Sequence, residues 1–193
     1  MNKRSYGFTL IEMMITLAVM GLLFMVGMPS MSTWLQNSQL RASAEATQAG
    51  LQLARAEALR RNAPVRFQLV DTFTAACVLS GNATNWIVSI NDPTGLCDVD
   101  PSDIAAPLTI QKRSGAEGSP NAVVAATGGS SIVFNGLGRT SGAAITQIDI
   151  TNTSGGNCQP AGPMRCLRIN ISSGGQMRMC DPAVTDNTDP RFC

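Results

Sequence analysis

The stretch of residues 3–31 constrains the fold more than any other part of the sequence. Lys3 and Arg4 form a short basic leader, and over residues 8–28 the only charged side chain is Glu12. At a helical rise of ~1.5 Å per residue, an apolar run of ~20 residues matches a hydrocarbon core of roughly 30 Å. The basic leader favours the cytoplasmic side. The pattern therefore predicts a chain that is anchored in a membrane by its N-terminus, with the rest outside.

A secretory signal peptide or a plain anchor is the simpler interpretation of such a run, but two features disfavour it. A signal peptide has a small-residue cleavage site after its apolar region, and this region ends in Met28-Pro29-Ser30-Met31. In addition, Glu12 lies inside the apolar run, where a carboxylate costs roughly 2.5–3.5 kcal/mol at mid-bilayer and less near the edge. A carboxylate at that position is expected to have a partner and a role.

The block Gly7-Phe8-Thr9-Leu10-Ile11-Glu12 resembles the class III signal of type IV pilins and type II secretion pseudopilins. The resemblance implies that a prepilin peptidase cleaves after Gly7 and that the new Phe8 terminus is N-methylated. It also implies that Glu12 draws in the free amine of a neighbouring subunit during assembly. A buried carboxylate and a buried ammonium are each costly alone and tolerable as a pair. Pro29 occupies the position where many pilins have a helix-bending proline.

Composition excludes several classes of function. The chain has no histidine, which excludes Ser-His-Asp and Cys-His nucleophile arrangements and His-ligated metal sites. No nucleophile-base or carboxylate constellation stands out either, so we expect no enzyme, no cofactor and no metal site. The formal net charge of +1 falls to −1 without Lys3 and Arg4, which gives no global electrostatic case for nucleic acid. Asp98, Asp100 and Asp103 suggest a calcium loop, but the EF-hand ligand order and its central glycine are missing, which favours a solvated acidic loop.

The six cysteines predict disulfide bonds. None forms a C-x-x-C pair, and an even number in a translocated domain is typical of a disulfide framework. Six cysteines allow 15 connectivities, among which sequence alone does not choose. We favour sequential pairing because each pair closes a loop rich in turn residues. The pairs are Cys77–Cys97, Cys158–Cys166 and Cys180–Cys193.

The helix is expected to continue beyond the membrane. Apolar or small residues recur at spacings of three and four, which draws one stripe along a helix: Leu40, Ala44, Thr47, Leu51, Ala54 and Ala58. Asn62 and Pro64 mark the end, since asparagine tolerates a left-handed conformation and proline cannot continue a helix. The prediction is one helix of roughly 80 Å, with residues 8–31 in the membrane and residues 32–62 amphipathic, bent or loosened near Pro29.

After residue 62 the pattern changes to short strands between turns. Val65–Val70, Trp86–Ile90, Leu108–Lys112, Ser131–Phe134, Ile145–Ile150, Cys166–Ile171 and Gln176–Met179 are the expected strands. The segment between residues 71 and 121 is the least readable. The fold class is therefore α+β, with a long N-terminal transmembrane and amphipathic helix packed on a C-terminal antiparallel β-domain over residues 63–193.

Two further motifs narrow the resemblance. Residues 51–65 contain an L-x-x-A-R-x-E-A run and resemble the helix end of FimT/FimU-type minor pilins and the H-type pseudopilin, where a turn and a first strand follow. Residues 134–139, Phe-Asn-Gly-Leu-Gly-Arg, resemble a strand-and-turn motif of the H-type domain. A phosphate loop is the alternative for these glycines, but no Lys-Ser/Thr follows and no helix begins, so we expect a β-turn.

The C-terminal tail resembles the disulfide-closed tail of FimT/FimU-like proteins. Some relatives carry a Gly-Arg-x-Arg motif there, which is linked to DNA capture during transformation. The corresponding residues here are Gly175, Gln176, Met177 and Arg178, so the first arginine is absent and a phosphate would lose one charge-assisted contact. Arg178 is the candidate DNA contact, and a solvated strand residue is the favoured interpretation.

Together the motifs imply a minor type IV pilin, FimT/FimU-like, with a prepilin leader over residues 1–7 and a role in starting or capping a pilus. The H pseudopilin of type II secretion and a DNA receptor at a pilus tip are the alternatives. The implied partners are other pilins or pseudopilins, the prepilin peptidase and the inner-membrane assembly platform, with DNA only weakly supported. The implied location is the bacterial inner membrane, crossed once, with the C-terminal domain in the periplasm, and a pilus or pseudopilus after assembly.

Overall fold

The structure is a computed structural model that describes residues 7–142 and 144–193, and for residues 26–30 it describes the helical backbone without the side chains. The chain divides into two units, Met1–Leu35 and Gln36–Cys193. Residues 1–6 of the predicted leader and the side chain of Pro29 lie outside the described residues. The predictions made for them therefore stay predictions.

Helix α1 spans Leu10–Arg61, close to the predicted bounds. It ends where the sequence indicates. Asn62 has a φ of 48°, and the N–H of Ala63 donates to the carbonyl oxygen of Ala58 at 3.3 Å. This left-handed residue satisfies an end carbonyl of the helix, and Pro64 prevents its continuation. The helix stop predicted at Asn62 is confirmed.

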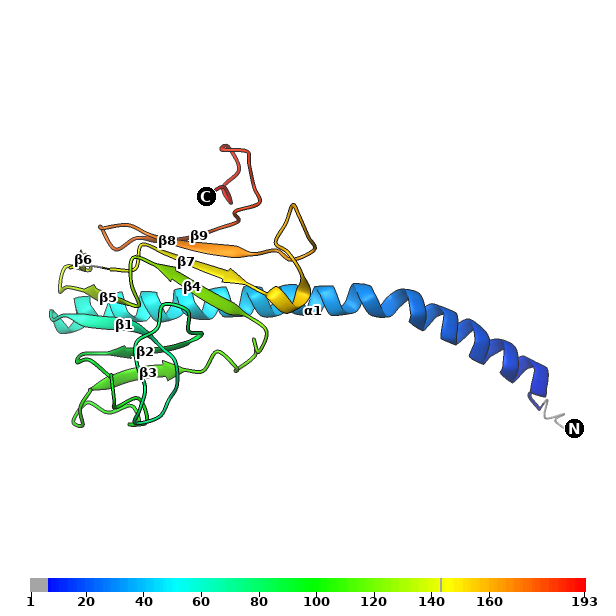
Figure 1. The fold of residues 1–193 in the computed structure, drawn as a ribbon, viewed down its shortest axis with the longest axis horizontal. Coiled ribbons are helices and arrows are strands. Elements are labelled where there is room, and N and C mark those ends of the chain that lie inside the picture. The colour runs from blue at the N-terminus through cyan, green and yellow to red at the C-terminus, as the bar shows by residue number, and fades with distance from the viewer. Residues whose placement is uncertain (1–6, 143) are drawn as a thin grey trace, which may run out of the picture. The chain divides into compact units, whose positions relative to one another are not determined.

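The strands form two antiparallel sheets (Figure 1). The first sheet has the order β3-β2-β1-β5-β6, and the second has the order β4-β7-β8-β9. A short 3₁₀ helix, η1, spans Thr153–Gly155. The strand bounds are β1 Val65–Val70, β2 Asn85–Ser89, β3 Thr109–Arg113, β4 Val123–Thr127, β5 Ser131–Phe134, β6 Thr140–Ser141, β7 Gln147–Thr151, β8 Leu167–Ile171 and β9 Met177–Cys180.

The predicted strands are all present, with bounds that differ by no more than two residues, but the sequence did not reveal β4 and β6. Strand β4 reads Val-Val-Ala-Ala-Thr, and alanine has little preference for strands. All of its residues pair with β7, and these backbone hydrogen bonds stabilise the strand despite its low strand propensity. Strand β6 is only two residues long and is defined by its pairing with β5.

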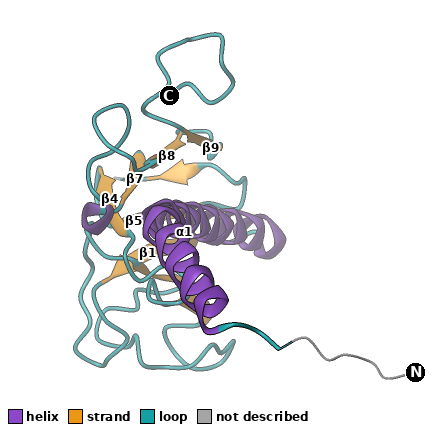
Figure 2. Ribbon diagram, turned by 90° about the vertical axis from the view of Figure 1, so that its right-hand side faces the viewer, coloured by secondary structure: helices purple, strands orange, loops and turns teal. Residues whose placement is uncertain are grey.

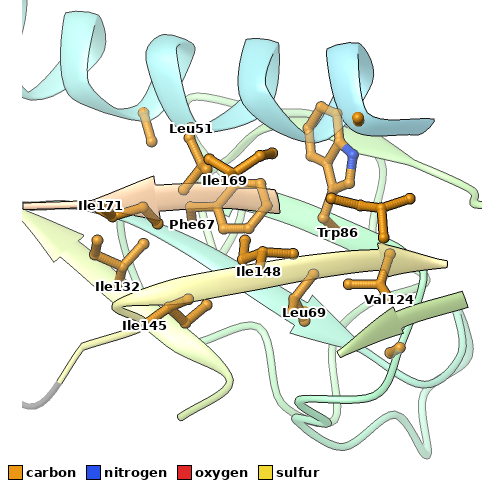
Figure 3. Close-up of a cluster of buried hydrophobic side chains, with 14 of the residues drawn as sticks. Leu51, Phe67, Leu69, Trp86, Val124, Ile132, Ile145, Ile148, Ile169 and Ile171 are labelled. Carbon is orange, nitrogen blue, oxygen red and sulfur yellow. The ribbon is translucent and has the colours of Figure 1, made fainter. Parts of the chain in front are cut away.

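The main core lies between the helical stretch of residues 40–58 and the two sheets (Figures 2 and 3). Every residue of the predicted helix stripe is buried, from Leu40 to Ala58. Phe67 and Trp86 pack against the helix, and their ring centroids lie 5.7 Å apart. A Cβ on Gly50 would come within 3.0 Å of both rings, so glycine at this helix position allows the close approach.

A second, smaller core explains the segment that was hardest to read. Val70 and Ile87 lie on the face of the first sheet that points away from α1, and the buried disulfide between Cys77 and Cys97 packs against them with Phe73 and Leu79 at its margin. The other two disulfides join Cys158 to Cys166 and Cys180 to Cys193, so the structure has the sequential pairing that the sequence favoured.

Over the residues that the structure describes, which omit the side chains of residues 26–30, no helix is long and apolar enough to cross a membrane.

Candidate assembly site

Glu12 takes part in a reciprocal cap at the start of α1. Its Oε2 accepts hydrogen bonds from the N–H and the hydroxyl of Thr9, both at 3.2 Å, and its own N–H donates to the Thr9 hydroxyl oxygen at 3.3 Å. The Thr-x-x-Glu spacing is that of a capping box, which satisfies N–H groups at a helix start. The carboxylate is thereby held at the N-terminal end of the helix, where the macrodipole favours a negative charge.

The capping box leaves part of the Glu12 carboxylate available. Its contacts with Thr9 use Oε2, and Oε1 hydrogen-bonds to no residue in the described part of the chain. The carboxylate is exposed. It can therefore accept a further hydrogen bond or pair with a cation that approaches the start of the helix.

The bond between Gly7 and Phe8 lies in an exposed, non-helical segment just before α1. The Phe8 side chain is 82% exposed, and a Cβ on Gly7 would meet nothing within 4 Å. The N-terminal part of α1 also exposes its large apolar side chains, among them Leu10, Ile15 and Leu23. Soluble monomers rarely expose contiguous apolar surface of this kind, which marks a membrane or protein contact surface.

Three of the motifs found in the sequence meet at the end of α1. Arg55 from the L-x-x-A-R-x-E-A run donates through Nε to the carbonyl oxygen of Gly138 at 3.0 Å. Gly138 lies in the turn between β5 and β6, where its N–H donates to the carbonyl oxygen of Asn135 at 2.8 Å, so the predicted β-turn is confirmed. A Cβ on Gly175 would collide with the Gly138 carbonyl oxygen. The β8–β9 turn therefore packs directly on this turn.

A charged cluster closes the last turn of α1. Glu57 accepts from Arg60 at 2.7 Å and from Arg61 at 2.9 Å, and Arg61 also pairs with Asp103 at 2.8 Å. The hydrogen bonds from Arg60 and then Arg61 lower the pKa of Glu57 from 4.5 to about 2. The cluster joins the helix end to the loop before β3, and its Glu57 stays ionised at neutral and mildly acidic pH.

Arg178 lies on β9, the edge strand of the second sheet, and its guanidinium donates to the carbonyl oxygen of Phe192 in the C-terminal tail. The N–H of Asp181 donates to the carbonyl oxygen of Arg191 at 2.8 Å, and a disulfide joins Cys180 to Cys193. These contacts return the end of the tail to the end of β9, while the loop between them extends away from the sheet (Figure 1). Arg178 thus has an internal partner, and its contact with DNA stays a prediction.

Two neighbouring arginines are also paired within the chain. Arg168 contacts Asp149 at 2.6 Å with both side chains half-buried, and Arg191 contacts Asp189 at 2.7 Å. Its Arg191 partner lowers the pKa of Asp189 to about 2. Of the four arginines over residues 165–193, two are therefore paired with aspartates, which reduces the positive charge available to DNA in this region.

The capping box and the hydrogen bond between Arg55 and Gly138 were not predicted from the sequence. The first had a readable signal, since Thr9 and Glu12 stand in the Thr-x-x-Glu spacing directly before an apolar run. The second had a partial signal, because the motifs that carry Arg55 and Gly138 were both recognised. Nothing in the sequence indicated that they touch.

Known proteins resemble the chain in two separate regions. The family described as type II transport protein GspH matches residues 43–175, and the prokaryotic N-terminal methylation motif matches residues 2–28. No curated protein matches the chain.

Two crystal structures of the type IV minor pilin FimU from Pseudomonas aeruginosa PAO1 are also similar. One is 12% identical with a TM-score of 0.48 and covers 72% of this chain and 90% of its own. The other, in a second crystal form, is 14% identical with a TM-score of 0.44 and covers 72% of this chain and 87% of its own.

Proposed function

This chain belongs to the family of the type II transport protein GspH, and from that premise we propose that it is a minor pilin of the FimT/FimU type. In this proposal a prepilin peptidase processes the chain, which then takes part in initiating or capping a type IV pilus. The observation that carries the proposal is the block Gly7-Phe8-Thr9-Leu10-Ile11-Glu12 at the start of α1, inside the match to the N-terminal methylation motif.

Processing is supported by the accessibility of the cleavage point. The Gly7–Phe8 bond lies in an exposed segment outside the helix, where a peptidase can bind the backbone in an extended form. Cleavage there removes residues 1–7 and leaves Phe8 with a free amine, which is then N-methylated. The new terminus precedes the capping residue Thr9 by one position, so the capping box survives the cut.

Assembly is supported by the free oxygen of Glu12. An amine at the Phe8 terminus of a neighbouring subunit would pair with this carboxylate as the helices pack side by side. Within an apolar filament core, each charge alone carries a large desolvation cost, and pairing offsets much of it. The exposed apolar side chains of residues 8–25 then pass from lipid into contact with other subunits, so they stay out of water and gain van der Waals packing.

Before assembly, residues 8–31 anchor the chain in the bacterial inner membrane, and the domain formed by residues 63–193 lies in the periplasm. The three disulfides are compatible with that oxidising compartment. The expected partners are other pilins, the prepilin peptidase and the assembly platform of the inner membrane. The proposed role is structural and not catalytic.

The H pseudopilin of type II secretion is the second candidate, because the family that covers residues 43–175 is described as a type II transport protein. The physical account of anchoring, processing and assembly is the same in a shorter fibre. The neighbouring genes distinguish the two, since a minor pilin is expected among pilus genes and a pseudopilin among secretion genes.

Replacement of Glu12 tests the proposal. Glu12→Ala is expected to leave membrane insertion intact and to abolish co-purification with the other subunits of the fibre. Glu45→Ala is a matched control, because Glu45 is an exposed helical glutamate that pairs with Arg41 at 3.0 Å outside the methylation motif. Unchanged co-purification of the Glu12→Ala chain would reject the assembly role.

A further inference from the structure

The ammonium of Lys112 on β3 lies in a cage of four oxygen atoms from the acidic loop. Its Nζ donates to the carbonyl oxygens of Cys97 at 3.3 Å, Asp98 at 3.1 Å and Val99 at 3.2 Å. It also lies 3.5 Å from Oδ1 of Asp100. Three consecutive carbonyl groups therefore converge on one cation, although backbone carbonyls in a loop ordinarily point to solvent or to N–H groups.

The chemistry of the cage matches an ammonium. A lysine ammonium has three N–H donors and no acceptor, and three carbonyls use all three donors. The aromatic face of Phe73 lies 5.8 Å from the same nitrogen, which adds a cation–π contact. The Lys112 side chain is only 20% exposed, whereas Asp100 is 95% exposed. The positive charge is thus drawn under the loop while the carboxylate stays in water.

The residue type at this position supports the same conclusion. Lys112 is the only lysine after Lys3, and all other basic side chains after residue 3 are arginines. A guanidinium is planar and presents its donors as a rigid fork, while an ammonium is a compact charge whose donors rotate freely. An ammonium can therefore direct three donors from a single nitrogen into three adjoining carbonyls.

Other contacts hold the loop at both of its ends. The disulfide from Cys77 holds its start at Cys97, and Arg61 holds Asp103 near its end at 2.8 Å. The acidic side chains do not themselves converge, since no group of three His, Cys, Asp or Glu side chains in the described part of the chain is placed to hold a metal. Between these ends the N–H groups of Val99 and Ser102 donate to the carbonyl oxygens of Leu96 and Thr109 at 3.3 and 2.9 Å. Lys112 engages the carbonyl oxygens of residues 97–99.

We propose that Lys112 is the resident cation of this acidic loop. Its ammonium takes the place that a bound metal ion has in a calcium loop, so residues 97–103 keep their fold without any metal. Ile104, which is 93% exposed, directly follows this loop. The proposal gives this segment a definite conformation that is independent of the calcium concentration outside the cell.

Hydrogen exchange of the full chain in detergent micelles, read by mass spectrometry, tests the proposal. In Lys112→Met the hydrogen-bonded amides of Val99 and Ser102 are expected to exchange at least about tenfold faster, because the loop opens more readily once its carbonyls lose a charged donor. Lys112→Arg should also exchange faster, since it keeps the charge but not the geometry. Arg113→Met, the neighbour on the same strand, should exchange like the unmodified chain, as should the unmodified chain with added calcium or EDTA.

Three results would overturn the proposal: wild-type exchange in Lys112→Met, full protection in Lys112→Arg, or slower exchange of the unmodified loop when calcium is added. Should Lys112→Met fail to fold, the unmodified chain provides the test. Acylation of Lys112 by an amine-reactive ester is expected to be at least about tenfold slower in the native chain than in urea, because the donors are engaged. Equal rates would contradict the cage.

Discussion

The Nε of Arg55 donates a 3.0 Å hydrogen bond to the carbonyl oxygen of Gly138, 83 residues further along the chain. This bond joins the end of α1 to the β5–β6 turn, and Gly175 brings the β8–β9 turn onto the same carbonyl. The three residues lie within the region that matches the GspH family. Their contacts bring two turns that are far apart in sequence onto the same end of the helix.

Arg55→Ala should lower the free energy of unfolding by about 1.5–3 kcal/mol, because it removes a charge-assisted hydrogen bond to the buried Gly138. Arg41→Ala is the control, since Arg41 forms an exposed pair with Glu45 of the kind that contributes little. Denaturant unfolding of both variants in the same detergent measures the difference. Equal stability of the two variants would show that the Arg55 bond does not hold the turn.

Gly175→Ala should be more costly than Gly118→Ala, although both glycines have φ near +80°. Each substitution incurs roughly 1–2 kcal/mol for a side chain in the left-handed region. A Cβ at position 118 enters open space, whereas one at position 175 strikes the Gly138 carbonyl oxygen. Thermal unfolding should therefore rank Gly175→Ala well below Gly118→Ala, and a similar melting temperature would argue against the close approach of the two turns.

The Cys77–Cys97 disulfide should contribute more to stability than the Cys180–Cys193 disulfide. Closure of either loop is worth about 3 kcal/mol by chain entropy. Cys77 and Cys97 are in addition buried in the small second core, while the Cys180–Cys193 bond ties down an exposed tail. Paired cysteine-to-alanine variants, compared by denaturant unfolding, measure the two contributions. A larger loss from the tail pair would contradict the importance of the second core.

Stability should fall in acid because of Glu57. Arg60 and Arg61 hold its pKa at about 2 in the folded protein, below its ordinary value of 4.5. The unfolded chain therefore binds the proton more readily, so this stabilisation is present above about pH 4.5 and is lost as the pH falls towards about 2. The difference in unfolding free energy between wild type and Glu57→Gln should shrink over that range. A difference that stays constant over that range would contradict the role of the two arginines.

Local features of the fold were predictable from the sequence. The helix stripe from Leu40 to Ala58, the stop at Asn62 and the strands from Val65 on follow from spacing and turn chemistry. Strand β4 was missed because its alanines carry no strand signal of their own, and only pairing with β7 defines it. The second core was missed because its members come from β1, β2 and two loops, which only the fold brings together.

Some of the functional contacts could be predicted from the sequence and others could not. Gly7, Phe8 and Glu12 form one short block, so their roles could be proposed from the motif alone. The Lys112 cage and the Arg55 bond join residues far apart in sequence, and the oxygens they contact belong to the backbone. Every residue has the same backbone carbonyl group, so a sequence motif does not indicate which carbonyl accepts such a hydrogen bond.

Mass spectrometry of the mature chain tests the central claim most directly. The account predicts that residues 1–7 are absent and that the chain begins at an N-methylated Phe8. An intact Met1 terminus, or a cut beyond the apolar run near Met31, would contradict it. Either result would show that the exposed block before α1 is not a processing signal, and that Glu12 does not serve assembly.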